Sequence, residues 1–263
     1  MSGGKATKFS TGDIIGLYKS EAARHGAGGT STIQDIRTRD LEMNAIFSYV
    51  RDGMRVLEVG CGNGYVAEQL VRTFAVELDA FDYSHDLAAI ATARQIKGAK
   101  GTVKFSQGDV LELDRRDTYD LVFSERCVQN LVSWEDQKRG LDNIRRSLKV
   151  GGEYVMLESF WSGLDNLNAA RAELDIEPIP ESWHNLFFKE QETIDYMQSI
   201  GCAYVDQNRF LSGYYFGSRV LLAAIMPKGK KVASSSILND YFCALPPAGD
   251  FSPMKILRFR RTK

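Results

Sequence analysis

The alternation of two kinds of segment between residues 54 and 160 constrains the fold of this chain more than any other feature. Five apolar runs, RVLEVG, VELDAFD, TVKFSQGD, YDLVFSE and EYVMLES, have the length and composition of buried strands. Helical patterns separate them, and in the first of these Val66, Leu70 and Val71 recur at helical spacing. Strands that alternate with helices pair in parallel, because each crossover returns the chain to the same edge of the sheet. The sequence therefore predicts a doubly wound α/β sheet with helices on both faces.

The last third of the chain departs from this rhythm. FKEQETIDYMQSIGC predicts a helix, AYVDQNRFL a strand, and MKILRFRRTK a final strand. About forty residues, 213–253, separate these two strands and contain further helical patterns. Because α/β sheets bind ligands outside the carboxyl ends of their strands, we expect 161–188 and 213–253 to form a cap over a ligand.

The first fifty residues divide into a tail and a helical segment. Residues 1–12 are rich in Gly, Ser and Lys, which predicts a disordered tail. Residues 13–53 are predicted to form a helical lid, with HGAGGTST, residues 25–32, as its flexible joint. Residues 54–263 then form the main domain.

Composition excludes several classes of protein. A net charge of −1 over 263 residues gives no overall attraction to nucleic acid or to an anionic membrane. The four cysteines are scattered, with no Cys-x-x-Cys pair and no histidine cluster, so we expect no bound metal and no disulfide framework. The longest apolar stretch, Val220 to Met226, is too short to span a bilayer, and the N-terminus has no apolar run typical of a signal peptide. We expect a cytoplasmic protein.

A glycine-rich turn follows the first predicted strand in the stretch VLEVGCGNGYVAEQL. Such turns usually bind a nucleotide, and the fingerprint of a dinucleotide site is G-x-G-x-x-G. Here Gly60, Gly62 and Gly64 are spaced G-x-G-x-G, and Glu58 precedes the first of them. A carboxylate at this point is a poor neighbour for a pyrophosphate and suits a ligand that carries positive charge. The glycines let the backbone approach that ligand without a Cβ in the way.

Two further carboxylates follow the next two strands. Asp82 closes the second strand, where it can accept hydrogen bonds from both hydroxyls of a ribose. Asp109 follows the third strand, where it can accept from an adenine amino group. A single acid at the end of a strand is more often a helix cap, but the ordered set of loop, acid and acid favours a cationic nucleoside over two phosphates.

These motifs resemble those of a known family. EVGCGNG, FDYS and GDV are similar to the successive motifs of the class I S-adenosylmethionine-dependent methyltransferases, over residues 54–160. The resemblance implies a seven-stranded Rossmann-like sheet whose last strand is antiparallel, and S-adenosylmethionine as the cofactor. It also implies that the methionine part lies against Glu58 and the glycine loop, the ribose at Asp82, the adenine at Asp109, and the amino group near Glu125. The residues of these motifs that it assigns to cofactor binding are Glu58, Gly60, Cys61, Gly62, Asp82, Tyr83, Gly108, Asp109, Val110 and Glu125.

A weaker resemblance covers other parts of the chain. ERCVQNLVSWEDQ, WHNLFF and LPPAGDFSP are similar to a bacterial subgroup of small-molecule methyltransferases associated with surface-glycan and secondary-metabolite gene sets. Methyl transfer to a hydroxyl needs a base, commonly His, Asp or Glu. The candidates are His184 in the first cap segment, Glu125 and Glu158 at strand ends, and His25 beside the flexible joint. The structural alternative for each is an ordinary core or surface role.

Two elements of the lid also carry candidates for the cofactor site. Arg37 and Arg39 lie on the helix before the first strand, and we expect one of them, Arg37 in our assignment, to reach the carboxylate of the cofactor. Tyr18 is a further cofactor-binding candidate from the lid.

The sequence predicts methyl transfer to a small polar acceptor, most simply O-methylation of a sugar or secondary metabolite. N-methylation, a non-methylating cyclase or lyase that releases methylthioadenosine, an NAD-binding oxidoreductase and a non-catalytic partner subunit are the alternatives. We expect a small-molecule acceptor as partner, no nucleic acid or membrane, and a monomer or homodimer.

Overall fold

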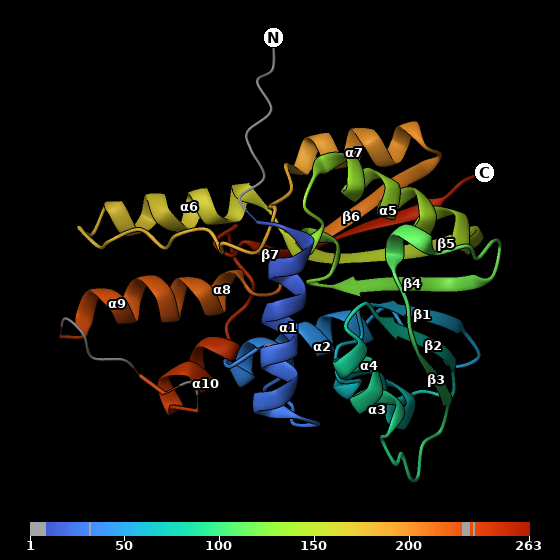
Figure 1. Ribbon diagram of the computed structural model, residues 1–263. Coiled ribbons are helices and arrows are strands. Elements are labelled where there is room, and N and C mark those ends of the chain that lie inside the picture. Colours follow the sequence, from blue (N-terminus) through green and yellow to red (C-terminus); the bar gives the residue numbers. More distant parts are fainter. Residues whose placement is uncertain (1–8, 32, 228–231, 234) are drawn as a thin grey trace.

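The computed structural model describes residues 9–31, 33–227, 232–233 and 235–263 and confirms the predicted α/β architecture (Figure 1). One sheet contains seven strands in the order β3-β2-β1-β4-β5-β7-β6. The strands are β1 (Arg55–Val59), β2 (Glu77–Asp82), β3 (Thr102–Gln107), β4 (Tyr119–Glu125), β5 (Leu148–Ser159), β6 (Cys202–Asn208) and β7 (Met254–Arg261).

Thirteen helical elements accompany the sheet in the described residues. They are α1 (Thr11–His25), α2 (Ile36–Phe47), α3 (Tyr65–Thr73), α4 (His85–Thr92), η1 (Val110–Glu112), η2 (Val128–Asn130), α5 (Trp134–Ser147), α6 (Trp161–Ala172), α7 (Glu190–Ser199), α8 (Ser212–Tyr215), η3 (Phe216–Leu221), α9 (Leu222–Ile225) and α10 (Ile237–Cys243). α8, η3 and α9 follow one another without a break, and η3 is a π-helical segment.

Pairing in the sheet changes direction at its last strands. β3, β2, β1, β4 and β5 are parallel to one another, and the register places Val56 of β1 opposite Leu121 of β4. β7 is antiparallel to both β5 and β6. The parallel strands therefore end at one edge, and in Figure 1 the arrowhead of β4 points toward α1, which lies across that edge.

The apolar core lies on both faces of the sheet. Successive strand residues point to opposite faces, so Val56 packs with α2 and α3 while Leu57 packs with α5 and α7. Both side chains are at most 2% exposed. This burial on two faces explains why the strands are nearly continuous apolar runs, as is typical of parallel sheets.

The N-terminal segment differs from its prediction at one end. Residues 1–8 of the predicted tail lie outside the described residues, but residues 9–12 belong to the first helix and its cap rather than to a tail. Phe9 is buried, and Ser10 caps α1 by accepting from the Asp13 amide at 3.3 Å while the Asp13 carboxylate accepts from the Ser10 amide at 2.8 Å. This reciprocal capping box satisfies amides that the first turn leaves without partners, which fixes where α1 begins.

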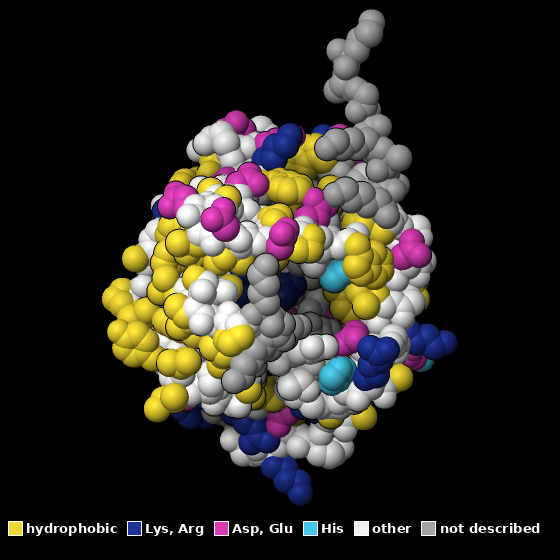
Figure 2. Space-filling view, turned by 90° about the vertical axis from the view of Figure 1, so that its left-hand side faces the viewer, with side chains coloured by type: hydrophobic (Ala, Val, Ile, Leu, Met, Phe, Trp, Pro, Cys, Tyr) yellow, Lys and Arg dark blue, Asp and Glu magenta, His cyan; other side chains and the backbone are white. Residues whose placement is uncertain are grey.

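The second predicted cap segment, 213–253, packs against α2 and α6, and none of its described residues lines the cavity described below. Tyr214 donates to both oxygens of Asp35, and Arg219 pairs with the same carboxylate at 2.7 Å. α9 and α10 expose large apolar side chains, among them Ile225 (73% exposed), Ile237 (82%) and Tyr241 (63%). Figure 2 shows many hydrophobic side chains on the face that α6, α9 and α10 occupy in Figure 1.

None of the helices in the described ranges combines the length and the apolar character that crossing a bilayer requires.

Candidate functional site

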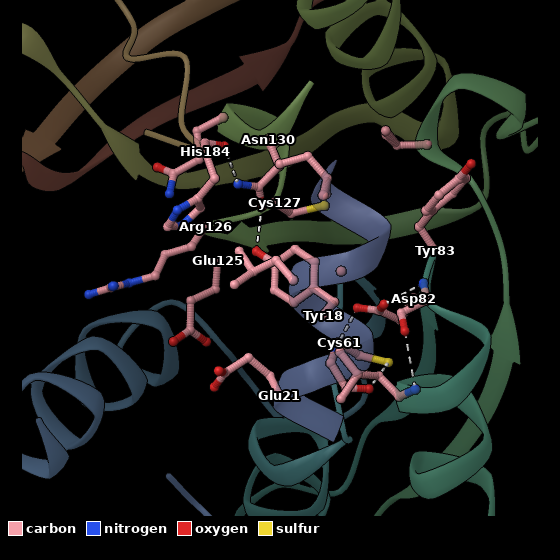
Figure 3. A pocket seen from close by; sticks show the side chains of 18 of the residues that line it. Tyr18, Glu21, Cys61, Asp82, Tyr83, Glu125, Arg126, Cys127, Asn130 and His184 are labelled. Atoms are coloured by element: carbon pink, nitrogen blue, oxygen red, sulfur yellow. Dashed lines mark hydrogen bonds between the residues drawn. The ribbon is translucent and has the colours of Figure 1, made fainter. Parts of the chain in front are cut away.

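A cavity of about 490 Å³ lies at the carboxyl ends of β1, β2 and β4. Glu58, Asp82 and Glu125, one from each of these strands, contribute to its lining. α1 covers the cavity with Ile14 and Tyr18, and the segment 182–185 closes another side. Figure 3 shows Asp82 and Glu125 on opposite sides of the space beside Tyr18. The volume is within the range of small-molecule sites in proteins.

The cavity brings together most of the residues that the sequence assigned to cofactor binding. Those in its lining are Tyr18, Glu58, Gly60, Cys61, Gly62, Asp82, Tyr83, Gly108, Asp109, Val110 and Glu125. His184, one of the candidate bases, is also in the lining.

The glycine loop has a conformation that only glycine adopts without strain. Gly60 and Gly62 have φ angles of 81° and 54°, in the left-handed region that Cβ atoms disfavour. A Cβ at Gly60 would also lie 2.5 Å from Sγ of Cys127. A Cβ at Gly62 would meet no protein atom within 4 Å, so glycine there leaves open space in the cavity. The loop therefore presents bare backbone to the cavity.

Asp82 at the end of β2 is fixed by the loops on either side of it. Its Oδ2 accepts from the Gly62 amide at 2.8 Å, and its Oδ1 accepts from the Ser84 amide at 2.8 Å. Burial raises the pKa of Asp82, and the two amides oppose that rise. Each carboxylate oxygen has a second lone pair, so the side chain can also accept from a pair of ligand hydroxyls.

Asp109 combines the two roles that the sequence left open. Its Oδ1 accepts from the Leu111 amide at 2.8 Å, which caps η1. It also lines the cavity together with Val110, which is 5% exposed. Capping leaves the second carboxylate oxygen available, so the cap and a contact with a ligand amine are compatible.

Three buried carboxylates gather at the other end of the cavity. Glu42 on α2, Glu58 and Glu125 each have one buried oxygen that accepts no hydrogen bond from the described residues. Burial, followed by the Glu125 and Asp82 charges, raises the pKa of Glu58 well above its ordinary value. Burial, followed by the Glu42 charge, raises the pKa of Glu125 to about 8. A ligand with positive charge relieves this repulsion, which fits the sulfonium and ammonium groups of S-adenosylmethionine.

Two arginines face these carboxylates. Arg126 follows β4 in a left-handed conformation, with φ of 54°, and its Nε and Nη2 donate to Oε1 of Glu42 at 3.0 and 2.6 Å. Arg39 on α2 is 6% exposed, and its charge opposes the rise in the pKa values of both Glu58 and Glu125. The two guanidinium groups thus partly balance the acidic end of the cavity.

The structure does not place Arg37, our assignment from the sequence, in the cavity, and of the two arginines on α2 it is Arg39 that lies there. Arg37 forms an ion pair with Asp240 of α10 and is not among the cavity residues, whereas Arg39 is. Two positions along a helix turn the side chain by about 200°, so only one of the two arginines faces the strand ends.

His184 is the candidate base that the structure places in the cavity with an available ring nitrogen. Its Nδ1 is buried and has no hydrogen-bond partner among the described residues. Burial, followed by the Arg126 charge, lowers the pKa of His184. A lowered pKa keeps the imidazole neutral, the form that accepts a proton. Figure 3 shows the His184 and Arg126 side chains next to each other at the edge of the cavity.

Two other candidate bases have different positions. His25 is not among the cavity residues, and its ring lies 3.6 Å from the carboxylate of Glu21, a neighbour that does line the cavity. Glu158 is fully buried outside the lining and accepts from the Val128 amide at 3.0 Å and the Gln129 amide at 3.1 Å. We therefore assign Glu158 to holding the turn after β4 in place.

The sequence did not single out Asn63, Asn130 or Glu42. Asn63 lies inside the quoted glycine motif, and its Nδ2 donates to the carbonyls of Gly26 and Gly28 at 2.8 and 2.9 Å. These bonds attach the predicted flexible joint to the glycine loop. The unpaired carbonyls of a glycine-rich joint were a signal for such a donor, but nothing local marked Asn130 or Glu42.

Within the described ranges, no cluster of three or more His, Cys, Asp or Glu side chains has an arrangement that could hold a metal ion.

The raised pKa of Glu125 predicts how stability depends on pH in the ligand-free protein. The folded state keeps the Glu125 proton up to about pH 8, whereas the unfolded chain releases it near the ordinary value of 4.5. Stability from this group is therefore lost as pH rises between these values, at no more than about 1.4 kcal/mol per pH unit. Glu125→Gln is expected to flatten the fall, which urea denaturation from pH 5 to 8.5 measures.

An exposed carboxylate provides the matched control for that measurement. Glu177→Gln makes the same substitution on the surface and is expected to leave the pH dependence unchanged. Identical slopes for wild type and Glu125→Gln would contradict the burial of a protonated Glu125.

Comparison with known proteins identifies a methyltransferase domain in this chain. Residues 56–152 match the family model described as "Methyltransferase domain". Malonyl-(acyl-carrier protein) O-methyltransferase of Bacillus anthracis is 35% identical over 101 residues, which are 38% of this chain and 35% of that protein. Phosphoethanolamine N-methyltransferase 2 of Caenorhabditis elegans is 31% identical over 111 residues, 42% of this chain and 25% of that protein. The chain thus spans about a third or less of the length of these curated relatives.

A solved structure extends the likeness of fold to nearly the whole chain. The 4+2 cyclase SpnF superposes with a TM-score of 0.58 at 18% identity, covering 97% of both chains. This likeness concerns the fold, and it includes the sheet and the elements beyond residues 56–152. With the glycine loop, the strand-end acids and the sheet order, the comparisons support one assignment. Residues 56–152 therefore form a methyltransferase domain, and the described fold is that of the class I S-adenosylmethionine-dependent methyltransferases.

Proposed function

We propose that this protein transfers the methyl group of S-adenosylmethionine to the hydroxyl of a small polar acceptor, a sugar or secondary metabolite. The observation that carries the proposal is the position of His184. Its buried Nδ1 has no partner among the described residues, and it lines the same cavity as Glu58, Asp82 and Glu125. A base beside a nucleoside site is the arrangement that O-methylation needs.

Each end of the cavity has its own part in this proposal. Asp82 would accept from the ribose hydroxyls and Asp109 from the adenine amine, while Glu58, Glu125 and Arg39 would hold the charged methionine end. The cofactor, when bound, supplies an activated methyl group. The chain then has to align the acceptor in a dry pocket, which accounts for much of the rate in such a displacement. His184 Nδ1 would accept the acceptor's proton.

N-methylation is the second candidate, because carboxylates in the cavity also suit an amine acceptor. Glu21 on α1 lines the cavity in addition to Glu125, and Figure 3 shows both near its lower edge. An amine that arrives neutral needs no base, so N-methylation would not depend on His184. The curated relatives include methyltransferases named for O- and for N-transfer, and the choice for this chain is therefore a proposal.

The test uses the purified protein with S-adenosylmethionine that carries a deuterated methyl group. Pools of sugars, phenols, hydroxy acids and amines are added separately, and mass spectrometry records S-adenosylhomocysteine and the labelled product. The proposal expects label on oxygen in one hydroxyl pool. Release of methylthioadenosine without acceptor would instead support a cyclase or lyase. Cofactor binding with no turnover in any pool would contradict methyl transfer to a small molecule.

A further inference from the structure

One side chain, Asn130, connects the helix that covers the cavity with the segment that carries His184. Its Oδ1 accepts from the Tyr18 hydroxyl of α1 at 2.7 Å. Its Nδ2 donates to the His184 carbonyl at 3.2 Å and to Oδ1 of Asn185 at 2.9 Å. Figure 3 shows the Tyr18 and His184 sides of this bridge. Three segments that are distant in sequence thus meet at a single amide.

Asn130 itself is attached firmly to the sheet. The fully buried carboxylate of Glu158 accepts from the amides of Cys127, Val128 and Gln129, the residues just before it. The Gln129 side chain accepts from the Ser159 amide at 2.7 Å. These bonds fix the turn that ends at Asn130 to β5, so Asn130 is a stationary point between two peripheral segments.

α1 is held at two places, of which the Tyr18 bond is the weaker. At its C-terminal end, the Gly26 and Gly28 carbonyls accept from Asn63 of the glycine loop. The Arg94 guanidinium donates to the neighbouring Ala27 carbonyl at 2.6 Å. In the middle of α1, the Tyr18 hydroxyl makes one hydrogen bond, to Asn130. Such a bond contributes about 1 kcal/mol to stability, so thermal motion can break it. Opening of the N-terminal half of α1, which carries Tyr18, therefore breaks one hydrogen bond and the packing of Ile14, while the C-terminal end stays attached.

The geometry of the amide makes the two halves of the bridge depend on each other. The oxygen and the NH₂ group of Asn130 lie in one rigid plane, on opposite sides of the Cβ–Cγ bond axis. A hydroxyl that donates to the oxygen therefore keeps the NH₂ group directed at the His184 carbonyl. If the amide rotated by 180°, its oxygen would face that carbonyl oxygen, and the bond to His184 would be lost.

We propose that Asn130 is a positioning residue that couples closure of α1 over the cofactor to the placement of the His184 segment. When α1 lies over the cavity, Tyr18 orients the Asn130 amide, and the amide holds the main chain at His184 and the side chain of Asn185. The acceptor side of the site is thereby completed only under a closed helix. The inference rests on the proposed function, because it assigns His184 to the acceptor.

Hydrogen exchange with S-adenosylhomocysteine as the probe tests the coupling without a known acceptor. In the wild type, the probe is expected to slow amide exchange in 11–25 and in 182–188 together. Asn130→Asp keeps an acceptor for Tyr18 but removes the donor to His184. In this variant, 11–25 is expected to keep its protection and 182–188 to lose it. Tyr18→Phe, which removes only the hydroxyl, is expected to abolish the protection of 182–188 as well.

The affinity for the probe is a second measurement, and it distinguishes the coupling from a purely structural role of either residue. Tyr18→Phe and Asn130→Ala break the same bridge, so each is expected to weaken probe binding by about fivefold, and the double variant by no more than either alone. Tyr196→Phe is the matched control, because its hydroxyl donates to the Lys138 carbonyl at 2.9 Å outside the cavity. It is expected to behave like the wild type.

The outcomes separate this inference from the proposed function. If the probe binds and 182–188 stays fully protected in both Tyr18→Phe and Asn130→Asp, the coupling is wrong while the cofactor site stands. The coupling would also be contradicted if the double variant lost affinity by the product of the losses in the two single variants. If the wild type fails to bind the probe, the proposed function is overturned, and the coupling with it.

Discussion

Asp82→Asn is expected to weaken the binding of S-adenosylhomocysteine by about 100-fold. A hydrogen bond to a charged group contributes roughly 1.5–3 kcal/mol, and in the proposed function the carboxylate accepts from both ribose hydroxyls. The variant keeps one oxygen but replaces the other with an NH₂ group. Since Gly62 and Ser84 already donate to Asp82 at 2.8 Å, that group must face either a backbone donor or a ligand hydroxyl. Isothermal titration calorimetry measures the change directly.

Asp79→Asn is the matched control for this measurement. Asp79 lies on the same strand, accepts from the Tyr119 hydroxyl at 2.8 Å and is not among the residues that line the cavity. Its substitution is expected to leave probe affinity within about twofold, a difference of less than 1 kcal/mol. Undiminished affinity in Asp82→Asn would contradict the assignment of Asp82 to the ribose. Titration with NAD in parallel tests the oxidoreductase alternative, which predicts tighter binding of NAD than of S-adenosylhomocysteine.

The part of this site that was predictable from the sequence is the part built from local motifs. Glu58, Gly60 and Asp82 each lie at or next to the carboxyl end of a strand, and parallel strands bring these ends to one edge of the sheet. The seven-stranded sheet and its antiparallel last strand, β7, also followed, through the family resemblance. These features depend on residues within a few positions of one another, so the chain alone was sufficient to identify them.

The features that were missed depend on contacts between distant segments. Arg37 and Arg39 have the same chemistry, and only the packing of α2 decides which one reaches the cavity. Glu125 and Glu158 both lie at strand ends, but the amides of the turn after β4 occupy Glu158 and leave Glu125 in the cavity. Asn130 has no local signature because its partners, Tyr18 and His184, come from opposite ends of the chain. Local sequence patterns do not reveal such contacts between residues that are distant in the sequence.

His184→Gln is expected to lower kcat by about 100-fold or more with the acceptor that the pool experiment identifies, because a positioned general base contributes typically 10²–10⁴-fold. Glutamine retains hydrogen-bonding groups but accepts no proton at neutral pH. His85→Gln is the matched control, since the His85 side chain is 79% exposed at the start of α4 and is not among the cavity residues. An unchanged kcat in His184→Gln would contradict the role of His184 as the base.

The pH profile of kcat/KM separates His184 from Glu125, the other base that the cavity contains. Burial and the Arg126 charge lower the pKa of His184, so His184 as the base predicts that activity falls only below about pH 6.5, its ordinary value. Burial raises the pKa of Glu125 to about 8 in the ligand-free protein, so Glu125 as the base predicts a loss of activity that begins as pH falls below about 8.

Substitution of Arg126 gives a further test. Arg126→Met removes the positive charge beside His184 and is expected to move the acid limb of the profile to higher pH. Arg126→Lys keeps that charge and is expected to leave the acid limb in place. If Glu125 were the base, Arg126→Met would move its limb upward as well, but Glu125→Gln would then abolish the limb that His184→Gln leaves intact. Comparison of the pH profiles of Glu125→Gln and His184→Gln therefore decides which of the two groups takes the proton from the acceptor hydroxyl.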